Sequence, residues 1–236
     1  MIELKNISKS FSKTSVLRGV NLTFRKGTCV ALIGPNGCGK TTLIKTILGM
    51  VVADKGEILF DGKSIHREHV YRSRIGYMPQ IGRYPENMTI GQIIKMITNI
   101  RNPSEAVDPF LMTQFNLESI QNKRMRTLSG GTTQKVSATL AFLFNPDVLI
   151  LDEPTAGLDP LSAEILKEKI SCEKEKGKLI IVTSHMLNEL DDLVTELVYM
   201  QEGNISFHKS INELRTQTGE QKISRAISGM MKSGKL

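Results

Sequence analysis

The chain has 236 residues, of which 40% are hydrophobic and 23% are charged, and its 31 basic and 24 acidic residues give a formal net charge of +7. This length fits one or two domains with a sizeable core, and the composition excludes wholesale disorder. No uninterrupted apolar run approaches the roughly 18 residues that a membrane span needs. The first residues lack a basic segment followed by an apolar one, so we expect no signal peptide.

Cysteine and aromatic content exclude further classes of protein. Cys29, Cys38 and Cys172 are too few and too scattered for a disulfide framework or a zinc site, and they favour a reduced, cytoplasmic location. Aromatic residues make up only 5% of the chain and do not alternate with basic residues as a surface that stacks nucleic-acid bases requires. We therefore expect no nucleic-acid partner and attribute the basic excess to an ordinary solvated surface.

The hydrophobic pattern predicts alternating strands and helices around one helical insert. Strands are predicted at 2–7, 28–33, 57–60, 74–78, 148–151, 178–183, 196–200 and 204–208. Helices are predicted at 40–48, 89–99, 104–115 and 129–144, from Asp159-Pro160 to Gly177, and after a capping box at Ser210 and Glu213. The insert covers about 84–144, and residues 215–236 are expected to form a basic, mobile tail.

A glycine-rich turn between the second strand and the first helix matches the phosphate-binding loop pattern G-x-x-x-x-G-K-[ST]. Its backbone amides and the following helix N-terminus favour a polyphosphate. We expect Lys40 to reach the β- and γ-phosphates, the Thr41 hydroxyl to bind Mg²⁺ and Thr42 to bind a phosphate oxygen. The predicted ATP-binding residues of this loop are Gly34, Pro35, Asn36, Gly37, Cys38, Gly39, Lys40, Thr41 and Thr42.

Two carboxylates end the strand predicted at 148–151. Asp152 suits the coordination shell of Mg²⁺, directly or through water. Glu153 is placed to polarise the attacking water and is a predicted catalytic residue. A solvated acidic turn is the alternative for a single acid, but it does not explain the pair in a chain that also carries a phosphate-binding loop.

Several motifs together resemble the nucleotide-binding subunit of ABC transporters. Leu128 to Lys135 resembles the signature motif LSGGQxQR, with Thr132 in place of Gln and Lys135 in place of Arg. Ser129, Gly130 and Gly131 keep the core of the motif and are predicted to bind ATP at a helix N-terminus.

Four further positions match that family in order. Gln80 resembles the glutamine that contacts Mg²⁺ and the attacking water, Asp159 resembles the D-loop aspartate, and His185 resembles the switch histidine at the γ-phosphate. Phe11 stands where the family places an aromatic residue, usually Tyr, that stacks on adenine. Taken alone, Gln80 could be a solvated loop residue, His185 a helix cap and Phe11 a core aromatic.

The resemblance covers about residues 2–214 and implies an α/β fold: a P-loop NTPase core of the ABC ATPase type, with an antiparallel β region and a helical subdomain. It implies ATP and Mg²⁺ as cofactors, ATP hydrolysis, and a head-to-tail dimer with a second copy or a homologous ATPase subunit. It also implies separate transmembrane permease subunits, which would hold the chain on the cytoplasmic face of the membrane.

The segment after Gln80 resembles exporter-type members, including drug and sodium extrusion systems, and also the ATPase of copper processing in nitrous-oxide reductase maturation. A soluble ABC ATPase that is not coupled to transport is a further alternative, as is a non-catalytic clamp gated by ATP. A P-loop GTPase would need a guanine-reading motif, which the sequence lacks, and a small-molecule kinase would not explain Ser129–Gly131.

Overall fold

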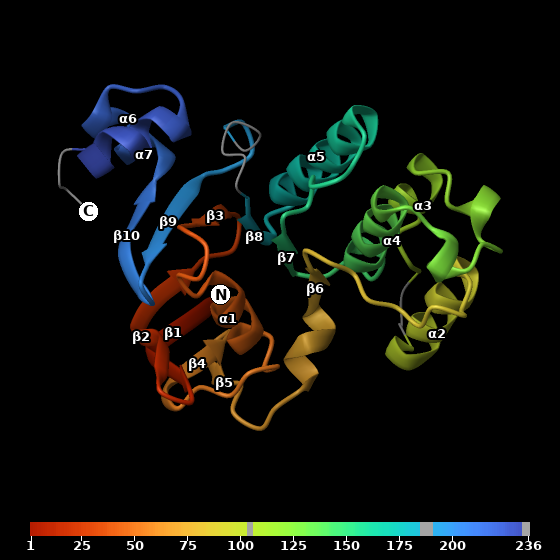
Figure 1. Ribbon diagram of the computed structural model, residues 1–236, viewed down its shortest axis with the longest axis horizontal. Coiled ribbons are helices and arrows are strands. Elements are labelled where there is room, and N and C mark those ends of the chain that lie inside the picture. Colours follow the sequence, from red (N-terminus) through yellow and green to blue (C-terminus); the bar gives the residue numbers. More distant parts are fainter. Residues whose placement is uncertain (103–105, 185–190, 233–236) are drawn as a thin grey trace.

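The computed structural model describes residues 1–102, 106–184 and 191–232. Figure 1 shows the four-stranded sheet on the left of the view, the six-stranded sheet running from the left to the centre, the helices of the insert on the right, and α6 and α7 beyond the end of β10. The strands are β1 (Ile2–Phe11), β2 (Thr14–Phe24), β3 (Cys29–Ile33), β4 (Lys55–Phe60), β5 (Lys63–Ser64), β6 (Ile75–Met78), β7 (Val148–Asp152), β8 (Leu179–Thr183), β9 (Glu196–Gln201) and β10 (Asn204–Ser210). The α-helices are α1 (Lys40–Ile47), α2 (Ile90–Arg101), α3 (Phe110–Gln114), α4 (Gly130–Phe142), α5 (Pro160–Glu175), α6 (Ile211–Thr218) and α7 (Ile223–Lys232).

A six-stranded sheet in the order β10-β9-β3-β8-β7-β6 forms the centre of the molecule, and all its pairs are parallel except that of β10 with β9. Every residue of β3, β7 and β8 is buried, as in a sheet covered on both faces. Because successive side chains alternate, Val30 and Leu32 pack into one core cluster and Ala31 and Ile33 into the other.

A four-stranded sheet in the order β2-β1-β4-β5 packs with α1 on one side of the central sheet. The hydrophobic pattern does not predict β2 and places the end of the first strand at Ile7, whereas β1 continues to Phe11 by pairing with β2. The pairing of β1 with β2 shifts register at several points, which breaks the strict alternation that reveals a strand in a sequence.

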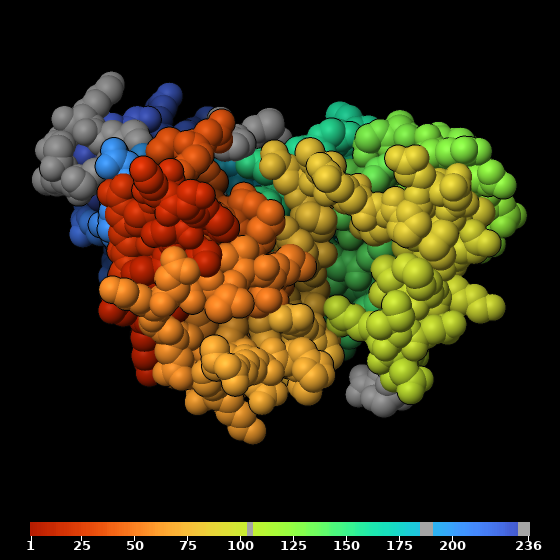
Figure 2. Space-filling model, turned by 60° about the horizontal axis from the view of Figure 1, so that its bottom comes forward, coloured from red at the N-terminus to blue at the C-terminus, as the bar shows by residue number. Residues whose placement is uncertain are grey.

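The helical insert begins with α2, where Thr89 and Gln92 form a reciprocal capping box. The prediction of a helix over 104–115 is wrong in its extent, because the described residues 106–109 are not helical and α3 covers only Phe110–Gln114. Pro109 disfavours the helical conformation of Asp108, whose carboxylate instead accepts a hydrogen bond from the Phe110 amide at 2.9 Å. Figure 2 shows the surface hollowed between the segment around residues 60–75 and this insert.

The segment predicted to be a mobile tail forms α7, which packs beside α6. Ile223, Ala226, Ile227 and Met230 are buried at helical spacing, a pattern that the Ser, Gly and Lys residues of the tail conceal in its composition. The Asp191 carboxylate accepts a hydrogen bond of 2.9 Å from the amide of Ile223 and so joins α7 to the segment before β9. Among the residues that the structure describes, no helix is long and apolar enough to cross a membrane.

Candidate functional site

The carboxyl ends of β3, β6 and β7 meet at one edge of the central sheet, where ligands bind in open parallel sheets. The glycine-rich turn leaves β3 there and leads into α1. A Cβ atom at Gly34, whose φ is 152°, would lie 2.0 Å from the carbonyl oxygen of Met200, so only glycine permits this path beside β9.

Lys40 folds back over the turn that it follows. Its Nζ atom donates hydrogen bonds to the carbonyl oxygens of Gly34 at 2.7 Å and Pro35 at 3.2 Å. These bonds hold a positive charge at the helix N-terminus, where the backbone amides also favour an anion.

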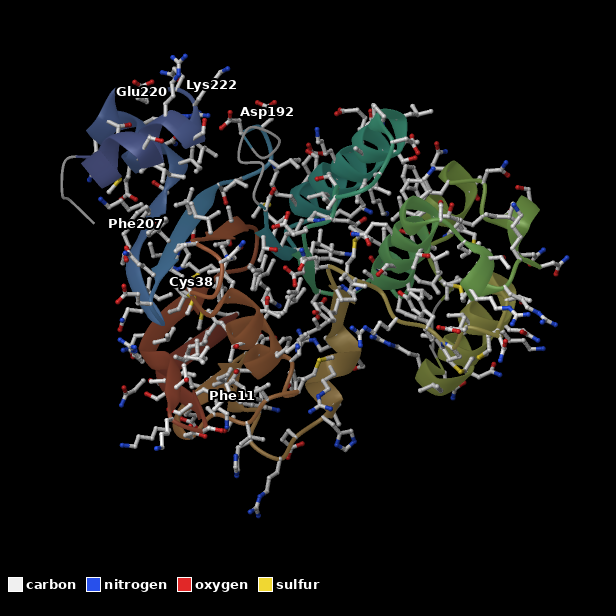
Figure 3. The ribbon with its side chains drawn as sticks, in the orientation of Figure 1. Phe11, Cys38, Asp192, Phe207, Glu220 and Lys222 are labelled. Carbon is white, nitrogen blue, oxygen red and sulfur yellow. The ribbon has the colours of Figure 1, made fainter. Side chains whose placement is uncertain are left out.

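Cys38 lies in the same turn, but its thiol is buried. Its carbonyl oxygen accepts a hydrogen bond of 3.0 Å from the Gly203 amide in the turn between β9 and β10. Figure 3 shows Cys38 beside these strands, apart from Phe11. The Cys38 side chain therefore packs into the core cluster that contains Leu43 and Met200 and does not line the cavity described below.

A cavity of about 560 Å³ joins the loop to residues from two neighbouring strands. Its lining consists of Val16, Asn36, Gly37, Gly39, Lys40, Thr41, Thr42, Gln80, Asp152 and Glu153. The structure thus brings together most of the predicted loop residues with the amide of Gln80 and both carboxylates. Gly34, Pro35 and Cys38 belong to the same turn but lie outside the lining.

Thr183, the last residue of β8, bonds to both acidic residues. Its hydroxyl donates a hydrogen bond of 2.5 Å to Asp152 Oδ1 and accepts one of 3.1 Å from the Glu153 amide. Glu153 has a φ of 53°, a conformation that is uncommon outside glycine and that often marks functional sites. Both acids are buried in the chain, at 6% and 8% exposure.

Two neighbours of the carboxylates were not predicted as site residues. Gln134 on α4 donates a hydrogen bond of 3.3 Å from Nε2 to the carbonyl oxygen of Glu153. Burial, together with the charge of Asp152, raises the pKa of Tyr77 on β6 to about 12. The retained glutamine of the signature motif was the only sequence signal for either contact.

The signature motif lies outside the lining of this cavity. Ser129 caps α4 by accepting a hydrogen bond of 3.2 Å from the Thr132 amide, and Ser129 and Gly130 are exposed. None of the three motif residues lines the cavity. A Cβ atom at Gly131 would lie 2.7 Å from the carbonyl oxygen of Gly157, so the motif packs closely on the turn that precedes α5.

Lys135 reinforces this packing. Its Nζ atom lies 2.8 Å from the Asp159 carboxylate, which also caps α5 by accepting a bond of 3.0 Å from the Ser162 amide. The hydrogen bond from Lys135 and those from Ser162 hold the pKa of Asp159 well below its usual range. Lys135 replaces the Arg of the family motif but keeps the positive charge, and this charge pairs with Asp159, the predicted D-loop aspartate.

The two remaining predicted residues are separate from the cavity. Phe11 is 47% exposed and does not line it, so packing of Phe11 in the core is excluded; the Nζ atom of Lys9 lies over its ring, 5.5 Å from the centroid. His185 lies outside the residues that the structure describes.

Comparison with known proteins decides the family. Residues 17–156 match the family model described as ABC transporter. The chain belongs to this family. It is 32% identical, over 89% of its length and 90% of the relative's, to the lantibiotic transport ATP-binding protein SrtF of Streptococcus pyogenes. It is 33% identical, over 86% of its length and 68% of the relative's, to the Nod factor export ATP-binding protein I of Paraburkholderia xenovorans.

Solved structures agree with this assignment. A structure described as the ATP binding subunit of an ABC transporter superposes with a TM-score of 0.90 at 28% identity, covering 98% of this chain and 99% of the other. A dimeric cassette in a post-hydrolysis state with ADP and Pi shares the fold, with a TM-score of 0.80 at 23% identity over 89% and 98% of the two chains. The ABC ATPase fold, the P-loop NTPase core and the identity as an ATP-binding subunit with ATPase activity are confirmed.

Proposed function

We propose that the chain powers an ABC exporter by hydrolysing ATP in the cavity that its P-loop shares with Gln80, Asp152 and Glu153. The convergence of these groups on one space of about 560 Å³ is the observation that carries the proposal. The names of the relatives, which refer to lantibiotic transport and Nod factor export, support the exporter class over the copper-processing alternative.

In this proposal the P-loop holds the phosphates of ATP. The amides of the loop and of the first turn of α1 surround the anion, and Thr42 adds a hydroxyl donor. Lys40 exchanges its contacts with the Gly34 and Pro35 carbonyls for the β- and γ-phosphates, because a phosphate is the stronger partner of an ammonium group. Phe11 stacks on adenine outside the cavity, and His185 binds the γ-phosphate.

The chemistry of the cavity fits Mg²⁺. Mg²⁺ takes oxygen ligands and is usually held by one or two carboxylates together with substrate phosphates and water. Asp152, the Thr41 hydroxyl and the Gln80 amide oxygen supply such a set around one cavity, and within the described ranges no three His, Cys, Asp or Glu side chains form a separate metal cluster. The ion would neutralise charge on the transferred phosphoryl group.

Glu153 acts as the base that orients and deprotonates the attacking water. Its backbone is held at three points: the amide by Thr183, and the carbonyl by Gln134 and by the Ala156 amide at 3.1 Å. These bonds fix the backbone of Glu153, which lines the same cavity as Lys40 and Thr41, so a base is already positioned before the reaction.

A second chain completes each site. Ser129 and Gly130 are exposed at the N-terminus of α4 but do not line their own chain's cavity, which supports their use on ATP held by a head-to-tail partner. A permease docks near the Gln80 loop, where the neighbouring Ile81 is 70% exposed, and holds the dimer at the cytoplasmic face of the membrane.

Glu153→Gln tests the catalytic assignment. We expect kcat to fall about 100-fold or more because the water loses its base, while ATP binding is unchanged and an ATP-dependent dimer persists during size-exclusion chromatography. Glu202→Gln is the matched control, because Glu202 has the same side chain and also a positive φ, 47°, but lies in the turn after β9. Near-normal turnover by purified Glu153→Gln would remove Glu153 from this role.

A further inference from the structure

A β-bulge lies where the end of β1 meets the part of β2 that lines the cavity. Lys9 on β1 pairs with Leu17 on β2. The next residue of β1, Ser10, pairs with Ser15, which leaves Val16 as an extra residue of β2. Bulges next to functional sites often redirect a side chain, and Val16 is the residue of β2 that lines the cavity. The last residues of β1 therefore lie beside one wall of the site.

Asp54, in the segment before β4, holds the end of β1 through three hydrogen bonds. Its carboxylate accepts a bond of 2.7 Å from the Lys9 Nζ atom on one oxygen and another of 2.7 Å from the Ser10 amide on the other. Its own amide donates a bond of 2.8 Å to the carbonyl oxygen of Ser8. The bonds from Lys9 and Ser10 lower the pKa of the Asp54 carboxyl, so Asp54 stays charged at neutral pH and keeps Lys9 as its partner.

Lys9 connects Asp54 to the aromatic ring at the end of the strand. Lys9 and Phe11 are two residues apart on β1, so their side chains project from the same face of the strand. The Lys9 Nζ atom lies 5.5 Å from the centroid of the Phe11 ring, and the Lys9 side chain is only 17% exposed. The ammonium group is attracted to one face of the ring and covers it, so the opposite face is the one that a planar base can reach.

We propose that Asp54 and Lys9 position the stacking surface for the adenine base: Asp54 holds Lys9 against one face of Phe11, and the base stacks on the other. Both are positioning residues, since neither lines the cavity and both act through the Phe11 ring. This inference rests on the proposed function, because it concerns the base of the ATP whose phosphates the P-loop binds. The pair should therefore affect the binding of a nucleotide but not that of a phosphate ligand without a base.

Calorimetric titration of the full chain with ADP and with pyrophosphate tests the pair. Both ligands carry two linked phosphates, but only ADP carries a base. Lys9→Met removes the charge and keeps an unbranched apolar side chain. We expect it to weaken ADP binding about two- to fivefold, the ratio that one exposed cation–π contact supplies, with pyrophosphate binding unchanged. Lys9→Arg keeps the cation and should bind both ligands like the wild type.

Two further variants separate positioning from a general effect of charge. Asp54→Ala should weaken ADP binding as Lys9→Met does, because it releases Lys9 from its place. Lys5→Met is the matched control, since Lys5 also lies on β1 and pairs with Glu3 at 3.7 Å but is six residues before Phe11. It should change the binding of neither ligand.

A double-mutant cycle shows whether Lys9 acts through the ring. Lys9→Met combined with Phe11→Ala should bind ADP as Phe11→Ala alone does, because without the ring Lys9 has nothing to position. Effects that multiply would overturn the inference. Equal weakening of ADP and pyrophosphate by Lys9→Met, or unchanged ADP binding by that variant, would overturn it too.

Phe11→Ala and Glu153→Gln, assayed alongside, report on the proposed function. If Phe11→Ala weakens ADP binding alone and Glu153→Gln loses hydrolysis while Lys9→Met binds both ligands like the wild type, the inference fails and the proposed function stands. If Phe11→Ala binds ADP like the wild type, the stacking role of Phe11 fails and the inference fails with it, whereas the assignment of Glu153 is judged by hydrolysis.

Discussion

The P-loop and the signature motif are both glycine-containing turns at helix N-termini, yet only one of them faces reactive side chains. The P-loop lies at the sheet edge, where neighbouring strands bring Asp152 and Glu153 into the same cavity. The signature motif sits at the end of α4, packed on the turn before α5, with its serine and first glycine exposed. A helix N-terminus supplies an anion site, but the bound anion can react only where the fold also places catalytic side chains beside it.

The largest expected difference between the two turns lies in ATP binding by a single chain. Lys40→Ala should weaken binding about 100-fold, because charge-assisted bonds to phosphate are lost, whereas Ser129→Arg should leave it unchanged. Titration with a fluorescent ATP analogue measures both, and Lys45→Ala, which removes an exposed lysine in the last turn of α1, controls for lost charge. Equal weakening by Ser129→Arg would place the signature motif in its own chain's site.

Covalently linked dimers sharpen the comparison. With Lys40→Ala in one subunit and Ser129→Arg in the other, head-to-tail sharing leaves one intact P-loop facing an intact signature motif. With both substitutions in one subunit, both composite sites are damaged. We therefore expect severalfold more ATPase activity from the separated arrangement, assayed with the membrane partner present. Higher activity from the combined arrangement would contradict the sharing of sites between chains.

A smaller effect is expected at Phe11, which lies outside the cavity lining. Phe11→Ala should weaken binding of ATP and GTP alike by about three- to tenfold, since stacking contributes about 0.5–1.5 kcal/mol and depends little on the identity of the base. Phe11→Tyr keeps the ring and should retain affinity. If Phe11→Ala binds both nucleotides like the wild type, the adenine-stacking assignment of Phe11 fails, and the exposed ring needs another explanation.

The smallest effect concerns the ion pair that joins the two helices. Lys135 holds the pKa of Asp159 down in the folded chain, so the pair stabilises the fold above the usual aspartate pKa of about 4, and that contribution is lost as the pH falls through the lowered pKa. Lys135→Gln should therefore lower the melting temperature slightly at pH 7, with a difference that narrows below pH 4. A carboxyl NMR titration should show the pKa of Asp159 rising towards its usual value.

Local sequence rules predicted the elements that carry their own signals. The buried strands, the P-loop and the capped starts of α5 and α6 each depend on residues within one turn or one strand. The same rules missed β2 and the true extent of α3. Register shifts in the pairing of β1 with β2 obscure the alternation that would reveal β2 in the sequence. The apolar spacing of 104–115 predicts a longer helix, but Pro109 disfavours the helical conformation of Asp108, so α3 begins only at Phe110.

Contacts between distant segments could not be predicted. From the sequence, Lys135 is a departure from the signature motif, but in the structure it pairs with Asp159. Thr183 is the end of a buried strand in the sequence, but in the structure its hydroxyl bonds to Asp152. The positive φ of Glu153 accompanies the hydrogen bond that its carbonyl oxygen accepts from Gln134 of α4. Sequence motifs named the reactive groups, but only the fold shows which side chains orient them.

The register of β7 with β8, in which Asp152 pairs with Thr183, determines where the acidic residues of the site lie relative to the threonine hydroxyl. The threonine hydroxyl reaches both carboxylate residues only because the two strands end level with each other. Over evolutionary time the apolar residues of these strands are free to exchange for others of similar volume. A single-residue insertion or deletion in either strand is a different kind of change, because it slides Thr183 past Asp152 and turns alternate side chains to the opposite face. The chain should therefore tolerate many substitutions in β7 and β8 but almost no change in their length.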